Sequence, residues 1–183
     1  GAIQKKYAEM SAKKFTLDAA CYRAAKDIQN MIDAGLADGK SHQDAELAAF
    51  QEYAIECAII KVYGSEVSQF VSDEGIQIFG GMGFSKDTPM ESAWRDARIT
   101  RIYEVTNEIN RLLTVGMLLK KAMKGEIDVI TPATEVGNSL MGIPSFDTPD
   151  FSEILSEEKA MIAKLKNAFL LILFKYHKKP IAF

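Results

Sequence analysis

The chain has 183 residues, of which 48% are hydrophobic and 26% are charged, and its formal net charge is −3 at pH 7. This length builds one sizeable core with an appendage, and the composition is typical of a soluble globular protein. The negative net charge excludes nucleic acid as a main partner, because phosphate binding needs concentrated positive charge. The longest apolar run, Ala168–Phe174, is too short to span a bilayer.

Two long helices are predicted in the first part of the chain. From Ile3, apolar residues recur at three- and four-residue steps, which predicts a helix that ends near Gly35–Gly39. A second helix is expected to begin after the capping residue Ser41 and to run without a proline to Phe79. Gly64 in its interior is unfavourable unless another helix crosses closely at that point.

A glycine cluster and a short helix follow. Gly80, Gly81 and Gly83 allow the backbone to adopt positive φ and to approach a ligand closely. The run Thr88–Glu91 predicts a capping box with proline at the first helical position, and the helix should continue to about Arg98.

A third long helix is expected from about Thr106 to Lys124, with Gly125 at its end. Its apolar positions, Ile109 to Met123, predict a buried stripe. Glu104 stands just before this helix. A carboxylate at that place either caps the helix or performs chemistry, and the residues alone favour capping.

The C-terminal third is predicted to hold a linker and one more helix. Residues 126–149 contain three of the five prolines and indicate an extended linker. An amphipathic helix is expected from Asp150 to Lys179, docked on the protein, with peripheral membrane contact as the alternative. All long elements are helical. We therefore predict an all-α fold, an up-down helical bundle over residues 1–125 followed by the linker and an extension over residues 150–183.

Three motifs lie within 35 residues, in this order: QIFGGMGF from Gln77, RDAR from Arg95, and IYEVTNEINR from Ile102. Together they resemble the C-terminal helical domain of the flavin-dependent acyl-CoA dehydrogenases. The opening GAIQKKYAEM and the segment beyond Gly125 resemble the long-chain and very-long-chain branch, which carries a C-terminal extension. The resemblance covers residues 1–125 well and residues 126–183 loosely.

The resemblance implies that Glu104 is the base that takes the α-proton of an acyl-CoA thioester while FAD takes the β-hydride. A glutamate in a desolvated cavity suits this task, because burial raises its pKa. Tyr103 and Val105 are expected to line the substrate cavity, although Tyr103 is equally consistent with a packed core position. Where the family typically has glycine this chain has Val105, whose β-branched side chain resists positive φ.

The resemblance also implies two groups of FAD contacts. Gln77, Gly80 and Gly81 are expected to reach the adenosine pyrophosphate end of the FAD in a neighbouring subunit. Thr106 and Glu108 are expected to contact the FAD of their own subunit. The RDAR side chains are interpreted as structural, and no residues have the spacing of a metal site.

By resemblance, the parent protein is a homo-oligomeric enzyme that dehydrogenates fatty acyl-CoA and passes electrons to an electron-transferring flavoprotein. Its expected location is the cytoplasm of a bacterium or the mitochondrial matrix. The chain begins at Gly1 and shows no strand pattern, so we expect a fragment without the family's N-terminal helical domain, middle β-domain and first bundle helix. Such a fragment is expected to be inactive and to lose FAD. The alternative is a non-catalytic helical module for self-association or membrane docking.

Overall fold

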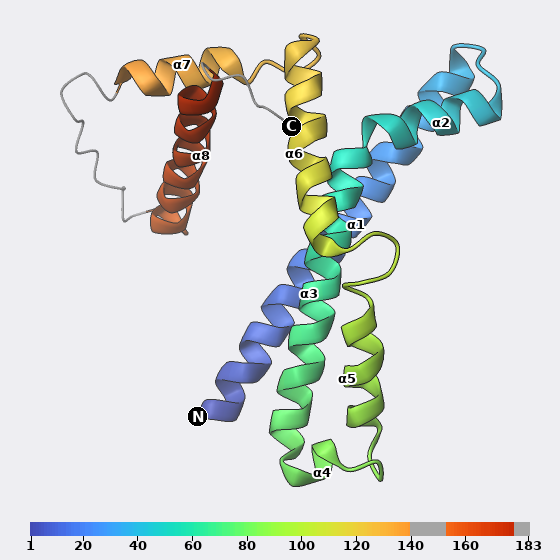
Figure 1. The fold of residues 1–183 in the computed structure, drawn as a ribbon, viewed down its shortest axis with the longest axis vertical. Helices are drawn as coiled ribbons and strands as arrows, with labels where there is room; N and C mark the ends of the chain where they lie inside the picture. The colour runs from blue at the N-terminus through green and yellow to red at the C-terminus, as the bar shows by residue number, and fades with distance from the viewer. Residues whose placement is uncertain (140–152, 178–183) are drawn as a thin grey trace. The chain divides into compact units, whose positions relative to one another are not determined.

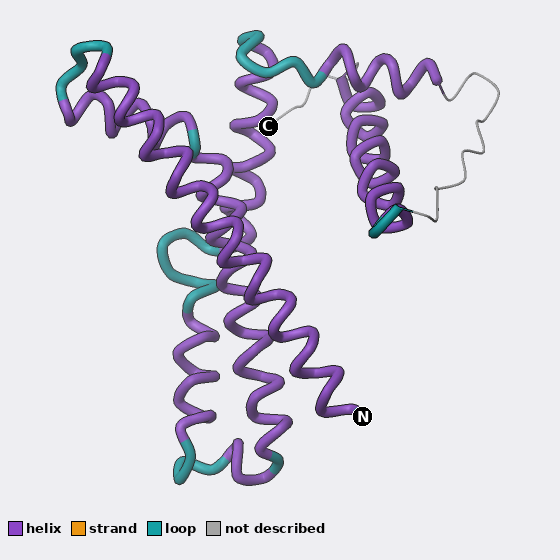
Figure 2. Tube along the Cα trace, turned by 180° about the vertical axis from the view of Figure 1, so that it is seen from behind, coloured by secondary structure: helices purple, strands orange, loops and turns teal. Residues whose placement is uncertain are grey.

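The computed structural model of the protein describes residues 1–139 and 153–177. In this part of the chain the regular elements are eight α-helices, without a strand, so the predicted all-α class is confirmed (Figures 1 and 2). The chain divides into two compact units, Gly1–Met117 and Leu118–Phe183.

The first unit is built on two long antiparallel helical segments (Figure 1). Helix α1 (Ala2–Ala37) ends where the sequence predicts. The predicted second helix is interrupted once, at Tyr53, and forms α2 (His42–Glu52) and α3 (Ala54–Phe79). Tyr53 has φ −92° and ψ 16°, outside the helical minimum, while hydrogen bonds continue on both sides of it. Neither proline nor glycine marks this interruption, so the sequence did not reveal it.

Small residues let these helices pack closely. Ile32 of α1 is buried with Ala45 and Ala49 of α2, and this is the main apolar cluster of the unit. Gly64 faces Leu17, since a β-carbon added to Gly64 would lie 3.2 Å from the Leu17 Cδ1 atom. The close helix crossing expected at Gly64 is therefore present, with α1 as the partner of α3.

After α3 the chain turns through α4 (Gly81–Phe84) and returns along α3 as α5 (Pro89–Ile99) (Figure 1). Pro89 occupies the predicted first position of the helix. The predicted capping box is wrong, because the Thr88 hydroxyl donates to the Met82 carbonyl oxygen at 2.7 Å and does not cap its own helix. That bond fastens the turn around α4 to the start of α5.

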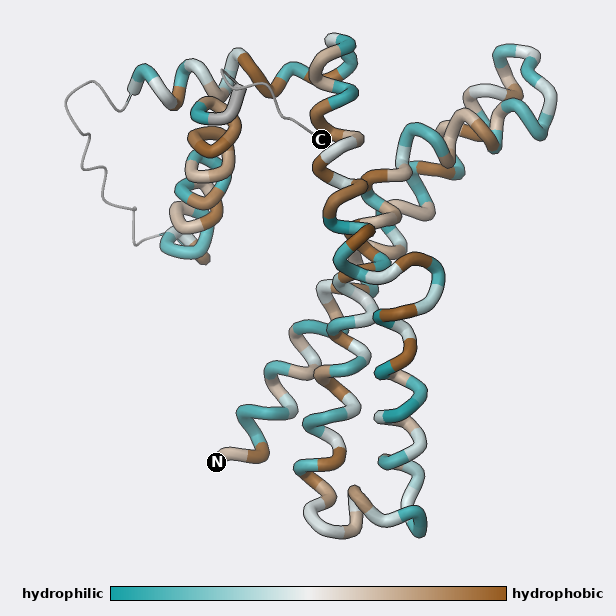
Figure 3. The backbone as a smooth tube through the Cα atoms, viewed as in Figure 1, coloured by the Kyte–Doolittle hydropathy of each residue, from teal (hydrophilic) through white to brown (hydrophobic). Residues whose placement is uncertain are grey.

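Helix α6 (Asn107–Met123) runs close to its predicted bounds, and Gly125 follows it at φ 73°. Its predicted buried stripe is wrong, because none of the apolar side chains of the stripe is buried. Leu119 is half-buried, and the exposed members are Ile109, Leu112, Leu113 and Met123. The buried residues of α6 are polar ones in its first turn, Asn107 and Asn110. Hydrophobic and hydrophilic residues alternate along its length (Figure 3). A periodic pattern shows which residues share a face, but it does not show what covers that face.

In the second unit, part of the predicted linker is helical. Helix α7 (Ile130–Ser139) lies inside residues 126–149, for which an extended conformation was predicted. Asp128 caps it, since its carboxylate accepts a 3.0 Å hydrogen bond from the Thr131 amide. Pro132 falls in the first turn, where the missing amide hydrogen costs nothing. A proline is thus compatible with this helix because of where it stands.

Helix α8 (Ser156–His177) packs on α7 within this unit. A β-carbon added to Gly137 of α7 would lie 2.8 Å from the Phe174 ring, which shows how closely the two helices approach. Other apolar side chains of α8 stay exposed, for example Met161 and Leu165, each at 64%. Among the described helices, none combines the length and apolar content that a bilayer-spanning segment needs. The predicted cap Asp150 and the basic residues Lys178 and Lys179 lie outside the described residues.

Candidate functional site

The turn between α5 and α6 has a strained backbone. Glu104 has φ 50° and Val105 has φ 71°, both in the left-handed region. This region is unfavourable for residues with a β-carbon and most unfavourable for β-branched ones such as valine. The turn closes where the Asn107 amide donates to the Arg101 carbonyl oxygen at 3.1 Å. Such strain persists only where surrounding contacts impose it, and it is concentrated at functional sites.

A polar cluster of four residues imposes this conformation: Lys61 and Ser65 of α3, and Asn107 and Asn110 of α6. The Val105 carbonyl oxygen accepts a hydrogen bond from the Lys61 Nζ atom at 2.8 Å and another from the Asn110 Nδ2 atom at 3.0 Å. We call these four residues the Asn107 cluster.

The centre of the Asn107 cluster is withdrawn from solvent. Asn107 is only 1% exposed. Its Oδ1 atom accepts from the Lys61 Nζ atom at 3.0 Å, and its Nδ2 atom donates to the Ser65 Oγ atom at 2.8 Å. Buried polar groups with satisfied hydrogen bonds fix one local geometry, because breaking any bond leaves a group unpaired.

The predicted catalytic and substrate residues are accessible at the apex of this turn. Glu104 is exposed, and Tyr103 and Val105 are 48% and 50% exposed. The desolvated cavity expected around Glu104 is therefore not formed within the first unit. The α6 cap is Thr106, whose hydroxyl accepts from the Ile109 amide at 3.5 Å. Capping by Thr106 leaves the Glu104 carboxylate available for another task.

Glu108 is held in its ionised form. The pKa of its carboxyl lies below the ordinary value because the carboxylate accepts a hydrogen bond from its own backbone amide and another from Thr106. The positive charges of Arg101 and Arg111 act in the same direction. An ionised carboxylate accepts hydrogen bonds and repels anions. Glu108 therefore suits hydroxyl or imino donors of a ligand and is unsuited to a phosphate.

The three glycines of the loop after α3 have different structural surroundings. Gly80 adopts φ 61° and ψ −144°, a conformation open almost only to glycine. Gly83 packs against Ile76, where a β-carbon would meet the main chain. A β-carbon on Gly81 would meet nothing within 4 Å. Gln77 and Gly81 are exposed, so this loop offers an amide side chain and an open stretch of backbone.

The structure does not bring the two predicted groups of cofactor contacts together. Gln77, Gly80 and Gly81 belong to the end of α3 and the start of α4, before the first residue of α5, and Thr106 and Glu108 come after its last residue. Helix α4 lies at one end of α5, and α6 begins beyond the other end (Figure 1). The 11 residues of α5 alone span about 16 Å. Within one chain, the two groups of predicted FAD contacts are therefore separated by at least the length of α5.

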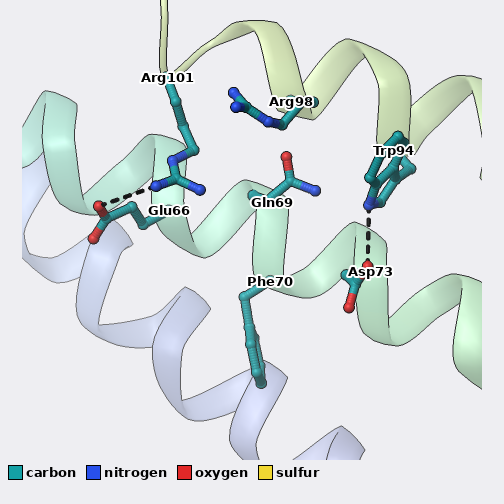
Figure 4. A pocket seen from close by; sticks show the side chains of 7 residues that line it. All are labelled: Glu66, Gln69, Phe70, Asp73, Trp94, Arg98 and Arg101. Atoms are coloured by element: carbon teal, nitrogen blue, oxygen red, sulfur yellow. Dashed lines mark hydrogen bonds and ion pairs between the residues drawn. The ribbon is translucent and has the colours of Figure 1, made fainter. Parts of the chain in front are cut away.

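A shallow groove between α3 and α5 contains the RDAR segment's Arg98 and also Arg101 (Figure 4). Trp94 donates to the Asp73 carboxylate at 3.1 Å across this groove. Glu66 of α3 accepts from Arg111 at 2.6 Å and lies 4.0 Å from Arg101. These contacts connect α3 to α5 and α6, but none of them is made by a side chain of the RDAR segment. Arg95 of that segment pairs with Glu91 of its own helix, so the structural interpretation of the segment stays a prediction.

Sequence reasoning missed the four residues of the Asn107 cluster. Lys61 and Ser65 appear there only as polar positions of a long helix, and their partners lie 42 to 46 residues away. The one available signal was the paired asparagines Asn107 and Asn110 directly after the turn. The motif contains both asparagines but indicates no separate role for either of them.

Comparison with known proteins adds a family assignment to this geometry. Residues 1–118 match the family model described as acyl-CoA dehydrogenase, C-terminal domain. A probable acyl-CoA dehydrogenase of Bacillus subtilis is 35% identical over 167 residues, which cover 91% of this chain and 28% of that protein. The mitochondrial very long-chain specific acyl-CoA dehydrogenase of Rattus norvegicus is 36% identical over 140 residues, covering 76% of this chain and 18% of the relative.

A solved structure is also similar. The crystal structure of an acyl-CoA dehydrogenase complexed with FAD from Bacillus anthracis superposes with a TM-score of 0.84 at 37% identity. The match covers 96% of this chain and 30% of that one. The chain thus spans less than a third of the length of each of these relatives.

Proposed function

The chain belongs to the acyl-CoA dehydrogenase family, and we propose on this basis that its protein catalyses the flavin-dependent α,β-dehydrogenation of fatty acyl-CoA thioesters. The observation that carries the proposal is the turn before α6. There, Glu104 stands exposed on a strained backbone whose geometry is fixed by buried hydrogen bonds.

In this proposal Glu104 is the base that removes the α-proton of the thioester. The reaction needs a carboxylate held at one place relative to the α-carbon, because proton transfer depends on reach and alignment before it depends on pKa. The Asn107 cluster supplies that fixed position through the Val105 carbonyl. Tyr103 and Val105 flank the carboxylate and would contact the acyl chain or the thioester.

FAD, which the family uses, would accept the β-hydride when bound. The chain's residues fit such a cofactor at two places. The open backbone at Gly81 and the exposed amide of Gln77 suit a pyrophosphate, since small residues let amide hydrogens approach phosphate oxygens. Thr106 and the ionised Glu108 suit hydroxyl and imino donors of a flavin.

Partners and location follow from the same proposal. The family resemblance assigns the two groups of cofactor contacts to the flavins of different subunits, and on this basis we propose a homo-oligomer in which each chain contributes to two sites. We propose an electron-transferring flavoprotein as the electron acceptor. The rat relative is described as mitochondrial and the Bacillus relatives are bacterial, so the mitochondrial matrix or the bacterial cytoplasm is the proposed location.

The Glu104→Gln variant tests this function. It keeps the shape of the side chain and removes its basicity, so the rate of flavin reduction by an acyl-CoA in the full-length gene product should fall by orders of magnitude. Glu126→Gln is the matched control, because Glu126 lies outside the turn and forms an ion pair with the nearby Lys124 at 3.4 Å. A Glu104→Gln rate within about tenfold of the wild-type rate would exclude Glu104 as the base.

A further inference from the structure

Lys61 is a half-buried lysine whose contacts lead to the turn that presents Glu104. It lies in the first third of α3 (Ala54–Phe79), and its ammonium donates to the Val105 carbonyl oxygen at 2.8 Å and to the Asn107 Oδ1 atom at 3.0 Å. Both acceptors are neutral. Lys61 joins α3 to the turn before α6 across 44 to 46 residues of sequence.

The contact with Val105 controls a strained peptide. At φ 71°, Val105 occupies a conformation that valine avoids. Rotation of this residue toward negative φ would release the strain, and it would swing the Val105 carbonyl away from α3. The 2.8 Å bond from Lys61 opposes that rotation. Asn110 holds the same oxygen from α6 at 3.0 Å, so the carbonyl is fixed from two helices.

Glu104 precedes this peptide and shares the strain, with φ 50°. Where its side chain points depends on the backbone of both residues. If Val105 relaxed, the Glu104 carboxylate would shift with it, although no contact to the carboxylate itself had changed.

We propose that Lys61 is a positioning residue for the candidate base: it holds the Val105 carbonyl in the strained conformation and thereby directs the Glu104 carboxylate toward the substrate. This inference rests on the proposed function for the role of Glu104, whereas the hold on Val105 stands on the geometry alone. Glycine at position 105 would adopt φ 71° without strain. Lys61 is therefore needed most when residue 105 is valine.

A double-mutant cycle in the full-length gene product tests the inference. Lys61→Met keeps much of the side-chain length and removes the donor, and it should lower kcat by roughly 10- to 100-fold with KM nearly unchanged, since small displacements of a catalytic group carry penalties of this size. Lys61→Arg retains a charged donor and should recover part of the loss. Lys26→Met, on the exposed side of α1, is the control and should leave kcat unchanged.

The decisive experiment makes the Lys61→Met substitution in the Val105→Gly variant. The loss in kcat should shrink to about threefold or less, because glycine needs no external hold. An equal loss in both backgrounds would mean that Lys61 acts only through general stability, and it would overturn the inference. A kcat for Lys61→Met within about twofold of the wild-type value would overturn it as well.

A second readout separates this inference from the proposed function. Amide hydrogen exchange in the peptide covering residues 101–110 should accelerate in Lys61→Met and not in Lys26→Met, whatever reaction the protein catalyses. If exchange accelerates in Lys61→Met while Glu104→Gln retains activity, the proposed function is wrong, and the conclusion that Lys61 holds the Val105 carbonyl still stands. Unchanged exchange in Lys61→Met would refute the conclusion that Lys61 holds the Val105 carbonyl in place.

Discussion

A β-carbon added to Gly83 would lie 2.5 Å from the carbonyl oxygen of Ile76 and 2.8 Å from its Cα atom. Both atoms belong to the main chain and cannot move aside as a side chain can. Two residues earlier in the same motif, a β-carbon on Gly81 would meet nothing within 4 Å. Gly83 is thus explained by packing inside the fold, whereas Gly81 has open space beside it and is explained only if a ligand binds there, as we propose.

Alanine substitutions at positions 83 and 81 should distinguish a glycine needed for packing from a glycine needed for cofactor binding. Gly83→Ala should lower the free energy of unfolding by about 1–3 kcal/mol, the usual cost of inserting a carbon into a filled space. Gly81→Ala should leave that free energy unchanged and reduce the FAD content of the full-length protein. Urea denaturation and flavin absorbance measure the two effects. Full FAD content in a stable Gly81→Ala variant would remove Gly81 from the cofactor site.

Val105→Gly should stabilise the protein. Removing the β-carbon at φ 71° releases strain of about 1–2 kcal/mol, and part of this gain is offset by the greater freedom of glycine in the unfolded chain. Thermal unfolding followed by circular dichroism should show a modestly raised Tm. Val115→Gly is the matched control: Val115 is a similarly exposed valine inside α6, where glycine lowers stability. A lower Tm for Val105→Gly would contradict the assignment of strain to this residue.

Glu108 should contribute to stability in a pH-dependent way. Its carboxyl has a lower pKa in the folded protein than its ordinary value of 4.5, so between these two pKa values the unfolded chain binds more protons. The contribution is present above pH 4.5 and is lost as the pH falls through the folded-state pKa. Glu108→Gln should therefore show a shallower loss of stability in acid than the wild type. Chemical denaturation at a series of pH values checks this, and parallel curves for the two proteins would exclude it.

Helix α8 should pack within the protein and not bind membranes. Its apolar residues are only partly covered by α7, and Glu157 and Glu158 lie in its first turn. Acidic residues of this kind disfavour anionic lipid surfaces. Co-sedimentation with vesicles containing anionic lipid should recover little protein, and a form cut after Ser139 should behave in the same way with a lower Tm. Salt-sensitive binding that the cut form loses would favour the membrane alternative.

The helices were predictable because their signals are local. Apolar spacing and terminal glycines predict α1 and α6 nearly at their bounds and also the end of α3 at Phe79, and Gly64 inside α3 predicts the close contact with Leu17. Helix α7 was missed because Pro132 was treated as a helix breaker, whereas a proline in the first turn costs little. The composition of a segment is thus less informative than the position of its proline.

The candidate site was predictable in part, for a related reason. Motif positions indicated Glu104 and its neighbours, and the valine in place of the family's glycine drew attention to the backbone at residue 105. The Asn107 cluster was not predictable, because its hydrogen bonds join α3 to α6 across more than 40 residues. No local pattern distinguishes a lysine that faces solvent from one that holds a distant carbonyl.

The long sequence separation within the Asn107 cluster has a consequence for the order of folding. Ser65 and Asn107 are 42 residues apart, and bringing them together must first overcome the entropy of closing that loop. Helices α3 and α5 form contacts over shorter separations, so the turn should acquire its left-handed residues after these two helices have paired. Ser65→Ala should then accelerate unfolding in stopped-flow measurements and leave the refolding rate nearly unchanged, whereas equal effects on both rates would place the turn in the folding transition state.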